Sequence, residues 1–310
     1  MVRAPIDVVV SARTQGVVVV GEFDGVHLRH RRLIALAQNR ADQLGTPVFA
    51  IVLDTDPSLT RLSIPRRRCE LLVSCGVSLA QVTSDSVDGE LSDTVQRLRP
   101  AELLIDSESF APLPLARFMA FLEQMNIPHS EPSTAQDGIA AISSRSIVGH
   151  VEAGNVEMAA RMLGRSFEMV GVIEPRTALR HPMGFRSIQL WPDGRLVALS
   201  PGIYAGTVHV SRRRVAVVVS VGVGVHRGAR GRTGPDPISV HTIGTFDALS
   251  DDEVSIDVVT RIGDPHPSSG SGAHAQFIDA HLRRVSDGSG STRSNRDCST
   301  QKNAESGSMP

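Results

Sequence analysis

The chain has 310 residues, of which 41% are hydrophobic, and its 32 Lys and Arg against 33 Asp and Glu leave a formal net charge of -1. At about 150 residues per domain, this length predicts two domains, each able to bury a core. The balanced charge excludes a strong overall field toward nucleic acid or an anionic membrane, and three cysteines without metal-ligand spacing exclude a disulfide framework.

The first twenty residues, MVRAPIDVVVSARTQGVVVV, contain a short apolar run that Arg13, Thr14 and Gln15 interrupt before an export-like hydrophobic region develops. We therefore interpret this segment as leading into a strand. The longest later apolar stretch, VAVVVSVGVGV from Val215, is too short for a bilayer span of about 20 residues. We expect a cytoplasmic protein without a membrane partner, and the cysteine usage agrees with a reducing compartment.

From residue 17 to about residue 164, apolar runs alternate with helix-like segments. This alternation is typical of βαβ units, and so of a parallel, Rossmann-like sheet with helices on both faces. In such a fold a nucleotide binds at the carboxyl ends of the strands. Strands are expected at VVVV, VFAIVL, SLAQVT, AELLID and near Ile127, and helices near residues 31–44 and 65–75, at SDTVQRLR and at LARFMAFLEQM.

The segment GEFDGVHLRH, residues 21–30, lies at such a strand end. A strand, a turn and a helix that begins near His27 would direct backbone N–H groups and the positive helix end toward an anion. His27 and His30 share one helix face and are able to donate to phosphates, although such a pair is also common on plain surfaces. Asp24 and Gly25 form a strong turn pair, and for Asp24 a turn role and a nucleotide role are weighed equally.

From about residue 167 to residue 262 the pattern changes to short strands separated by Gly, Pro and Asp. The runs EMVGVI, RSIQLW, YAGTVHV, VAVVVSVGV, ISVHTIG and VSIDVVTRI predict a second domain that is a small antiparallel barrel or sandwich. The amphipathic segment AHAQFIDAHLRRV predicts a closing helix. Residues 286–310 are rich in Ser, Gly and charge without apolar periodicity, and we expect a disordered tail there.

These motifs resemble a known family. GEFDGVHLRH is similar to the GxFDGVHxGH segment of prokaryotic bifunctional riboflavin kinase/FAD synthetases, and ISSRSIVGH is similar to their ISSTxIR segment. MGFRSIQL and PDGRLVALSPGIYAGTVHV resemble LGFPTANL and the DGVYAG strand of the kinase module. The likeness is collinear over most of residues 17–285. It implies an FAD synthetase-like nucleotidyltransferase domain over residues 1–165 and a riboflavin kinase-like β-barrel with its closing helix over residues 166–285.

The resemblance also implies an activity and a set of residues. The activity is FMN adenylyl transfer from ATP, with Mg2+, and the partners are small molecules, FMN or riboflavin among them, with no nucleic acid and no set oligomeric state. His27 and His30 are the implied catalytic pair; no protein residue is assigned to a metal. The implied nucleotide-binding residues are Gly21, Phe23, Asp24, Gly25, Ser143, Ser144 and Arg145, and the implied flavin or kinase-like residues are Gly184, Ser187, Gln189 and Tyr204.

The chain departs from the family where the first-domain chemistry lies. Arg29 replaces the middle Gly of HxGH, where its long side chain either blocks the phosphates or points away and adds positive charge. LDTDP places Asp56 at a family His, and IDSESFAPL has lost the glycines of the family loop GxDFxFG. In the ISSTxIR segment Arg145 replaces the Thr and Val148 replaces the last Arg.

The second domain departs further. Ser187 and Gln189 replace the Thr and Asn that help to hold nucleotide and metal in the family, and Ser239 replaces the Glu that acts as the kinase base. Loss of a general base costs about 10² to 10⁴ in rate, so we expect riboflavin kinase activity to be weak or absent. Core packing and flavin stacking both remain open for Trp191 and Tyr204.

Three hypotheses follow. The chain is an FMN adenylyltransferase with a lapsed kinase module, a catalytically lapsed paralogue that binds flavin or nucleotide as a regulator, or a nucleotidyltransferase for another phosphorylated small molecule. The runs of three arginines at 66–68 and 212–214 are interpreted as solvated faces, and His241 as a satisfied strand histidine.

Overall fold

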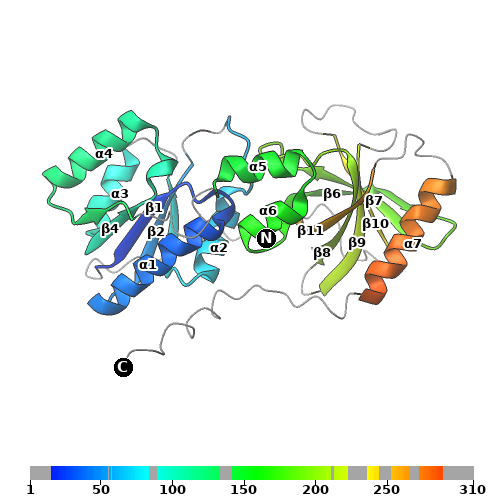
Figure 1. The fold of residues 1–310 in the computed structure, drawn as a ribbon, viewed down its shortest axis with the longest axis horizontal. Helices are drawn as coiled ribbons and strands as arrows, with labels where there is room; N and C mark the ends of the chain where they lie inside the picture. Colours follow the sequence, from blue (N-terminus) through cyan, green and yellow to red (C-terminus); the bar gives the residue numbers. More distant parts are fainter. Residues whose placement is uncertain are drawn as a thin grey trace, which may run out of the picture. The chain divides into compact units, whose positions relative to one another are not determined.

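The computed structural model describes residues 15–54, 56, 58–83, 89–132, 142–210, 213–222, 236–243, 253–264 and 272–288. These residues form two compact units, the first from 15–59 and 63–143 and the second from 60–62 and 144–288. Figure 1 shows a sheet with helices on both faces in the first unit and a barrel in the second. Each unit is described by itself.

The first unit is built on a five-stranded sheet with the order β3-β2-β1-β4-β5. All four strand pairs are parallel, with Val17 of β1 between Val48 of β2 and Glu102 of β4. The strands are β1 (Val17–Gly21), β2 (Val48–Leu53), β3 (Leu79–Thr83), β4 (Glu102–Ile105) and β5 (His129–Ser130). The helices are η1 (Asp24–Val26), α1 (Leu28–Leu44), α2 (Pro65–Ser74), α3 (Glu90–Leu98), η2 (Ser107–Ser109) and α4 (Pro112–Gln124).

The central strand explains why the sequence VVVV has no polar alternation. Val17 and Val19 pack into a core with side chains of α1 and α2, whereas Val18 and Val20 pack into a second core with side chains of α3 and α4. Both faces of β1 are therefore buried, as parallel sheets require. Helix α1 begins at Leu28, close to the start near His27 that the turn motif predicted and three residues before the start that the periodicity predicted. It ends at Leu44, and the following Gly45 caps it with a φ of 64°, which suits glycine.

The strand order places a topological switch point at β1. The chain continues from β1 to β2 on one side, and β4 pairs with β1 on the other side. In doubly wound sheets a ligand binds in the crevice beyond the carboxyl ends of the two strands at such a point. We refer to the end of β1 with the residues after it, 21–30, and to the residues after β4, 106–109, as the β1/β4 crevice.

The second unit contains a closed antiparallel barrel with the order β10-β7-β6-β11-β8-β9. The sequence left a barrel and a sandwich open, and the pairing of β9 with β10 closes the barrel. Its elements are α5 (Ser144–Glu152), α6 (Val156–Leu163), β6 (Phe167–Arg180), β7 (Arg186–Pro192), β8 (Gly202–Val210), β9 (Arg213–Val221), β10 (Ile238–Thr242), β11 (Glu253–Gly263) and α7 (Gly272–Gly288).

The expected fold class, a parallel-sheet domain followed by a small β-barrel, is confirmed. The two units meet at Ser143 and Ser144 rather than at residue 165, because α6 packs against β6 and β11 and so belongs to the barrel unit. Helix α7 packs against β9 and β10, and residues 289–310 of the expected tail lie outside the described residues. Within the described residues, no helix combines the length and hydropathy needed to cross a membrane.

Candidate functional site

The turn after β1 is buried and unusually strained. Phe23, Gly25 and Val26 have φ values of 49°, 73° and 41°, and Val26 is a β-branched residue in a region that favours glycine. Such conformations cost about 1–3 kcal/mol each in residues other than glycine, here Phe23 and Val26, and persist where the surroundings hold them. Here Asp24 supplies that hold, because its Oδ1 accepts from the backbone N and the Oγ of Ser63, each at 3.0 Å.

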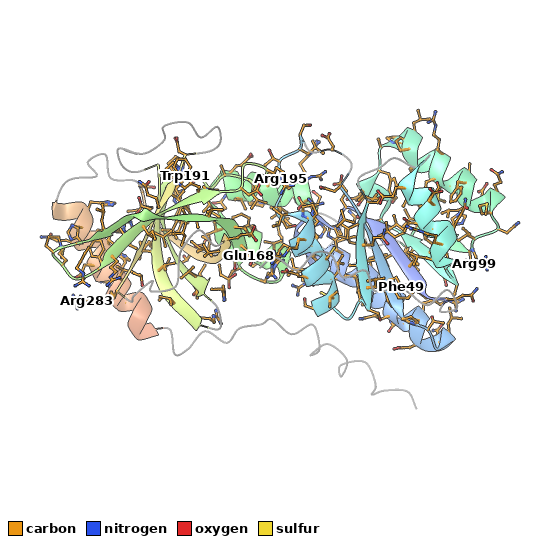
Figure 2. The ribbon with its side chains drawn as sticks, turned by 180° about the vertical axis from the view of Figure 1, so that it is seen from behind. Phe49, Arg99, Glu168, Trp191, Arg195 and Arg283 are labelled. Carbon is orange, nitrogen blue, oxygen red and sulfur yellow. The ribbon has the colours of Figure 1, made fainter. Side chains whose placement is uncertain are left out.

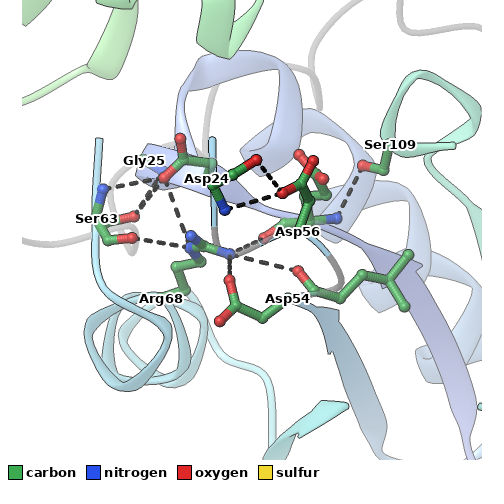
Figure 3. A network of polar contacts seen from close by, with 10 residues as sticks. Asp24, Gly25, Asp54, Asp56, Ser63, Arg68 and Ser109 are labelled. Atoms are coloured by element: carbon green, nitrogen blue, oxygen red, sulfur yellow. Dashed lines mark hydrogen bonds and ion pairs between the residues drawn. The ribbon is translucent and has the colours of Figure 1, made fainter. Parts of the chain in front are cut away.

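Arg68 completes the support of this turn (Figure 3). Its side chain is fully buried, and its Nε donates to the Ser63 carbonyl at 3.1 Å and lies 3.6 Å from Asp24 Oδ1. Its Nη1 donates to Asp54 Oδ1 at 3.2 Å. One guanidinium therefore ties α2 to the residues that follow β1 and β2.

The expectation that the arginines at 66–68 form a solvated face is wrong for Arg68. Arg66 and Arg67 pair with Glu70 at the surface, but Arg68 is 0% exposed. A signal was present, since Arg68 stands at the first position of the helical stripe that continues with Leu71, Leu72 and Cys75. The carboxylates of Asp24 and Asp54 explain how this charge tolerates burial.

The two histidines lie together at the start of α1. His27 is the N-cap residue and His30 lies in the first turn, and their rings stack with centroids 3.6 Å apart. Phe23 packs edge-on against His30, with centroids 5.4 Å apart. The expected proximity of His27 and His30 is thus present, and both histidines are buried.

Asp106, directly after β4, connects this histidine pair to the neighbouring strand. Its Oδ2 lies 3.3 Å from His30 Nε2 and accepts from Ser109 Oγ at 2.6 Å, while its Oδ1 accepts from Arg29 Nη2 at 3.1 Å. Burial alone would raise the pKa of Asp106, but His30, Ser109 and Arg29 outweigh it and hold the pKa below its usual value. The carboxylate is therefore charged at neutral pH.

Gly21 allows Asp106 to approach β1. A Cβ at Gly21 would lie 2.8 Å from the Asp106 Cβ and 3.1 Å from Ser109 Oγ. Ser109 Oγ in turn accepts from the backbone N of Glu22 at 2.8 Å. Gly21 thus serves the close contact between the ends of β1 and β4.

Arg29 is directed toward the loop that has lost the family glycines. Besides Asp106, its guanidinium contacts Glu108 through Nη1, and Arg29 is 8% exposed. The two departures from the family motif, Arg29 and the segment IDSESFAPL, are therefore in contact. Both departures are visible in the sequence, but their contact is not, because it depends on β4 lying beside β1.

His30 has one ring nitrogen without a protein partner. Its Nε2 faces Asp106, whereas its Nδ1 is buried and has no hydrogen-bond partner among the described residues. Since the Asp106 carboxylate requires a proton on Nε2, the Nδ1 is the atom of His30 left for a ligand.

Three other residues predicted to bind nucleotide lie where the chain passes from the first unit to the second. Ser143 is the last residue of the first unit, and Ser144 and Arg145 begin α5 of the second. Their contact with phosphate stays a prediction. Asp56 caps the following turn, since its Oδ1 accepts from the backbone N of Ser58 at 2.9 Å.

In the barrel, Ser187 and Gln189 of β7 lie opposite His241 and Ser239 of β10. The Ser187 Oγ is 2.7 Å from His241 Nδ1, and the Ser220 Oγ is 3.1 Å from His241 Nε2. Burial, reinforced by the charges of His274 and His181, lowers the pKa of His241 to about 3. His241 is therefore neutral and hydrogen-bonded on both sides, which confirms it as a satisfied strand histidine.

Tyr204 and Trp191 are both buried in the barrel, and a role of Tyr204 in flavin binding stays a prediction. Tyr204 is 0% exposed and its hydroxyl donates to the Ser200 carbonyl at 2.8 Å, while Trp191 of β7 is 8% exposed (Figure 2). This burial favours core packing over flavin stacking for both. Gly184 has a φ of 91° in a turn with open space around it.

The described residues contain no group of three or more His, Cys, Asp or Glu side chains placed to hold a metal ion. Neither of the described cysteines, Cys69 and Cys75, forms a disulfide.

Comparisons with known proteins agree with the motif resemblance. Residues 10–87 match the family model of FAD synthetase. The bifunctional riboflavin kinase/FMN adenylyltransferase of Pseudomonas fluorescens is 23% identical over 232 residues, which cover 67% of this chain and 72% of that protein. The protein of that name from Escherichia coli (strain K12) is 25% identical over 212 residues, covering 61% and 66%.

A solved structure shares the fold over nearly the whole chain. A protein from Streptococcus pneumoniae, described as a macrolide-efflux protein, superposes with a TM-score of 0.66 at 18% identity. The superposition covers 91% of this chain and 95% of that chain. At this identity the likeness shows the two-unit architecture alone.

Proposed function

We propose, from the similarity of this chain to the FAD synthetase family model and to bifunctional riboflavin kinase/FMN adenylyltransferases, that its first unit transfers the adenylyl group of ATP to FMN. The products are FAD and diphosphate. The observation that carries the proposal is the stacked His27 and His30 pair at the start of α1, in the β1/β4 crevice.

The reaction needs positive charge where diphosphate leaves. A phosphate oxygen of FMN forms a bond to the α-phosphorus of ATP, and the bond from that phosphorus to the bridging oxygen breaks. The N-terminus of α1 and an imidazole N–H of His30 would stabilise the negative charge that builds on the departing oxygen. Asp106 acts as a positioning residue, because it fixes His30 Nε2 and leaves Nδ1 to donate.

His27 would orient a phosphate group through a hydrogen bond, since its ring stacks on that of His30 at a centroid distance of 3.6 Å. Mg2+ would enter with ATP as MgATP.

The barrel is proposed as a kinase-like module with little or no riboflavin kinase turnover. Ser239 stands opposite Gln189 on β7 and Ser220 on β9, and none of these side chains carries a carboxylate. The low pKa of His241, about 3, makes it a poor base for the same proton. Riboflavin or FMN binding at Ser187 and Gln189 stays part of the proposal.

The test measures FAD formation from MgATP and FMN by chromatography, in a cytoplasm-like buffer. We expect His27→Ala and His30→Gln to lower kcat by about 10² to 10⁴. His129→Gln is the matched control, because His129 lies in the same unit on β5, with its Nδ1 2.8 Å from the Ile127 carbonyl. Absence of FAD from the unaltered protein, or equal loss in His129→Gln, would refute the proposal.

Calorimetry on the same samples separates binding from turnover. Flavin or nucleotide binding without FAD formation would favour the second hypothesis, a regulatory protein that has kept affinity and lost catalysis. Turnover with a phosphorylated acceptor other than FMN would favour the third.

A further inference from the structure

Arg29 holds two carboxylates, and they differ in exposure. Its own side chain is 10% exposed; Asp106 on one side is 7% exposed, whereas Glu108 on the other is 58% exposed. Asp106 is therefore the inner partner of the guanidinium and Glu108 the outer one.

The inner partner is fixed by several contacts. Asp106 accepts from Ser109 Oγ and faces His30 Nε2, and its backbone N donates to the Val20 carbonyl at 2.9 Å. The outer partner lies mostly in solvent, where an ion pair contributes little to stability. Glu108 thus leaves Arg29 at low cost, while Asp106 stays and keeps the guanidinium oriented.

A phosphate group is the natural replacement for Glu108. The planar guanidinium binds a carboxylate or a phosphate through the same pair of N–H donors. Asp106 joins Arg29 and His30 through one carboxylate, so both side chains lie in the same crevice. The buried Nδ1 of His30, which has no hydrogen-bond partner among the described residues, is a second donor for such a group once protonated.

We propose that Arg29 is a phosphate-binding residue of the β1/β4 crevice and that Glu108 is its built-in competitor, which the phosphates of a nucleotide displace. The inference rests on the proposed function, because it takes this crevice as the nucleotide site. It replaces the two earlier alternatives for Arg29, obstruction or an outward orientation, with a third in which the arginine is held for a ligand.

The test uses equilibrium binding of MgATP and of adenosine to the full chain, by calorimetry. Glu108→Gln removes the competing charge and keeps the shape. We expect it to tighten MgATP binding about three- to fivefold, which corresponds to about 1 kcal/mol or less, as suits an exposed competing ion pair, and to leave adenosine binding unchanged.

Glu102→Gln is the matched control. Glu102 of β4 pairs with Arg40 of α1, so this variant removes the same charge from a different ion pair of the first unit. We expect its MgATP affinity to stay within about twofold of the unaltered protein. Arg29→Met should weaken MgATP binding roughly tenfold or more and abolish the gain when combined with Glu108→Gln.

Several results would overturn the inference. Equal gains in Glu108→Gln and Glu102→Gln would reduce the effect to overall charge, and tighter binding in Arg29→Met would show that the arginine only obstructs. The inference would also be overturned if MgATP bound neither the unaltered protein nor Glu108→Gln.

The inference and the proposed function fail separately. If MgATP affinity follows the predicted order but no variant forms FAD, the adenylyltransferase proposal falls and the phosphate role of Arg29 stands. If FAD forms and depends on His27 while Glu108→Gln binds MgATP like the control, the proposed function stands and this inference falls.

Discussion

Replacement of Arg68 by Met tests the account of the strained turn most directly. The change removes a donor to the Ser63 carbonyl at 3.1 Å and a donor to Asp54 at 3.2 Å, and it leaves the buried Asp24 without its cation. Loss of one partner from a buried ion pair costs about 3–5 kcal/mol. Met keeps much of the apolar volume, so the cavity contribution stays small.

Hydrogen exchange followed by mass spectrometry measures this loss unit by unit. Peptides that cover β1 and β2 should lose protection by roughly 10² to 10³-fold or more, since about 1.4 kcal/mol corresponds to a factor of ten. Peptides from β8 and β9 of the barrel serve as an internal reference within the same sample.

Arg67→Met is the matched control for Arg68→Met. Arg67 is the neighbouring arginine, paired at the surface with Glu70 at 2.9 Å, and its loss should cost within about 0.5 kcal/mol. The double change Arg68→Met with Asp24→Asn should recover part of the protection, because it removes the unpaired carboxylate. Equal protection in Arg68→Met and Arg67→Met would refute the role given to Arg68.

Three further predictions concern other parts of the chain. The pKa of His241 is about 3 in the folded protein and near 6.5 in the unfolded chain, so the unfolded state takes up the proton first as the pH falls. The free energy of unfolding should therefore decrease below pH 6.5, by about 2 kcal/mol at pH 5. Urea unfolding at pH 7.5 and pH 5 measures this, and His241→Asn should remove most of the difference. Burial raises the pKa of the Cys69 thiol to about 11, so iodoacetamide at pH 8 should label it about 100-fold more slowly than an ordinary thiol. Unfolding in urea should remove this difference, and peptide mass spectrometry measures the labelling in both conditions. Gly45→Ala should lower the free energy of unfolding by about 1 kcal/mol because of the φ of 64° at this position. Gly149→Ala should raise it by up to about 1 kcal/mol, because Gly149 lies inside α5 with open space for a Cβ. Thermal unfolding measures both changes.

The fold was predictable because its signals are local. The uniformly apolar VVVV indicates a strand buried on both faces, and the alternation Val254, Ile256, Val258 in β11 indicates a strand with one buried face. The helix that follows residues 21–27 was predictable from the turn and from the apolar positions Leu33, Ile34 and Ala37, which recur with helical period.

The site was predictable only in part because its remaining contacts join distant segments. His27 and His30 are close in sequence, and their stacking follows from the helix. Asp106 reaches His30 only because β4 pairs with β1, and that pairing cannot be derived from either strand alone. Likewise, residues 66, 67 and 68 are all arginines and look equivalent in the sequence, but the packing of α2 buries Arg68.

The single tryptophan and the single tyrosine of the chain, Trp191 and Tyr204, both belong to the barrel. Excitation at the red edge of the tryptophan band therefore reports on the barrel, and the parallel sheet with its helices adds no emission of its own. A tryptophan introduced at Leu113, which is 66% exposed at the start of α4, would give the first unit its own signal. In a Trp191→Phe background the unfolding of that unit would then be read by fluorescence alone.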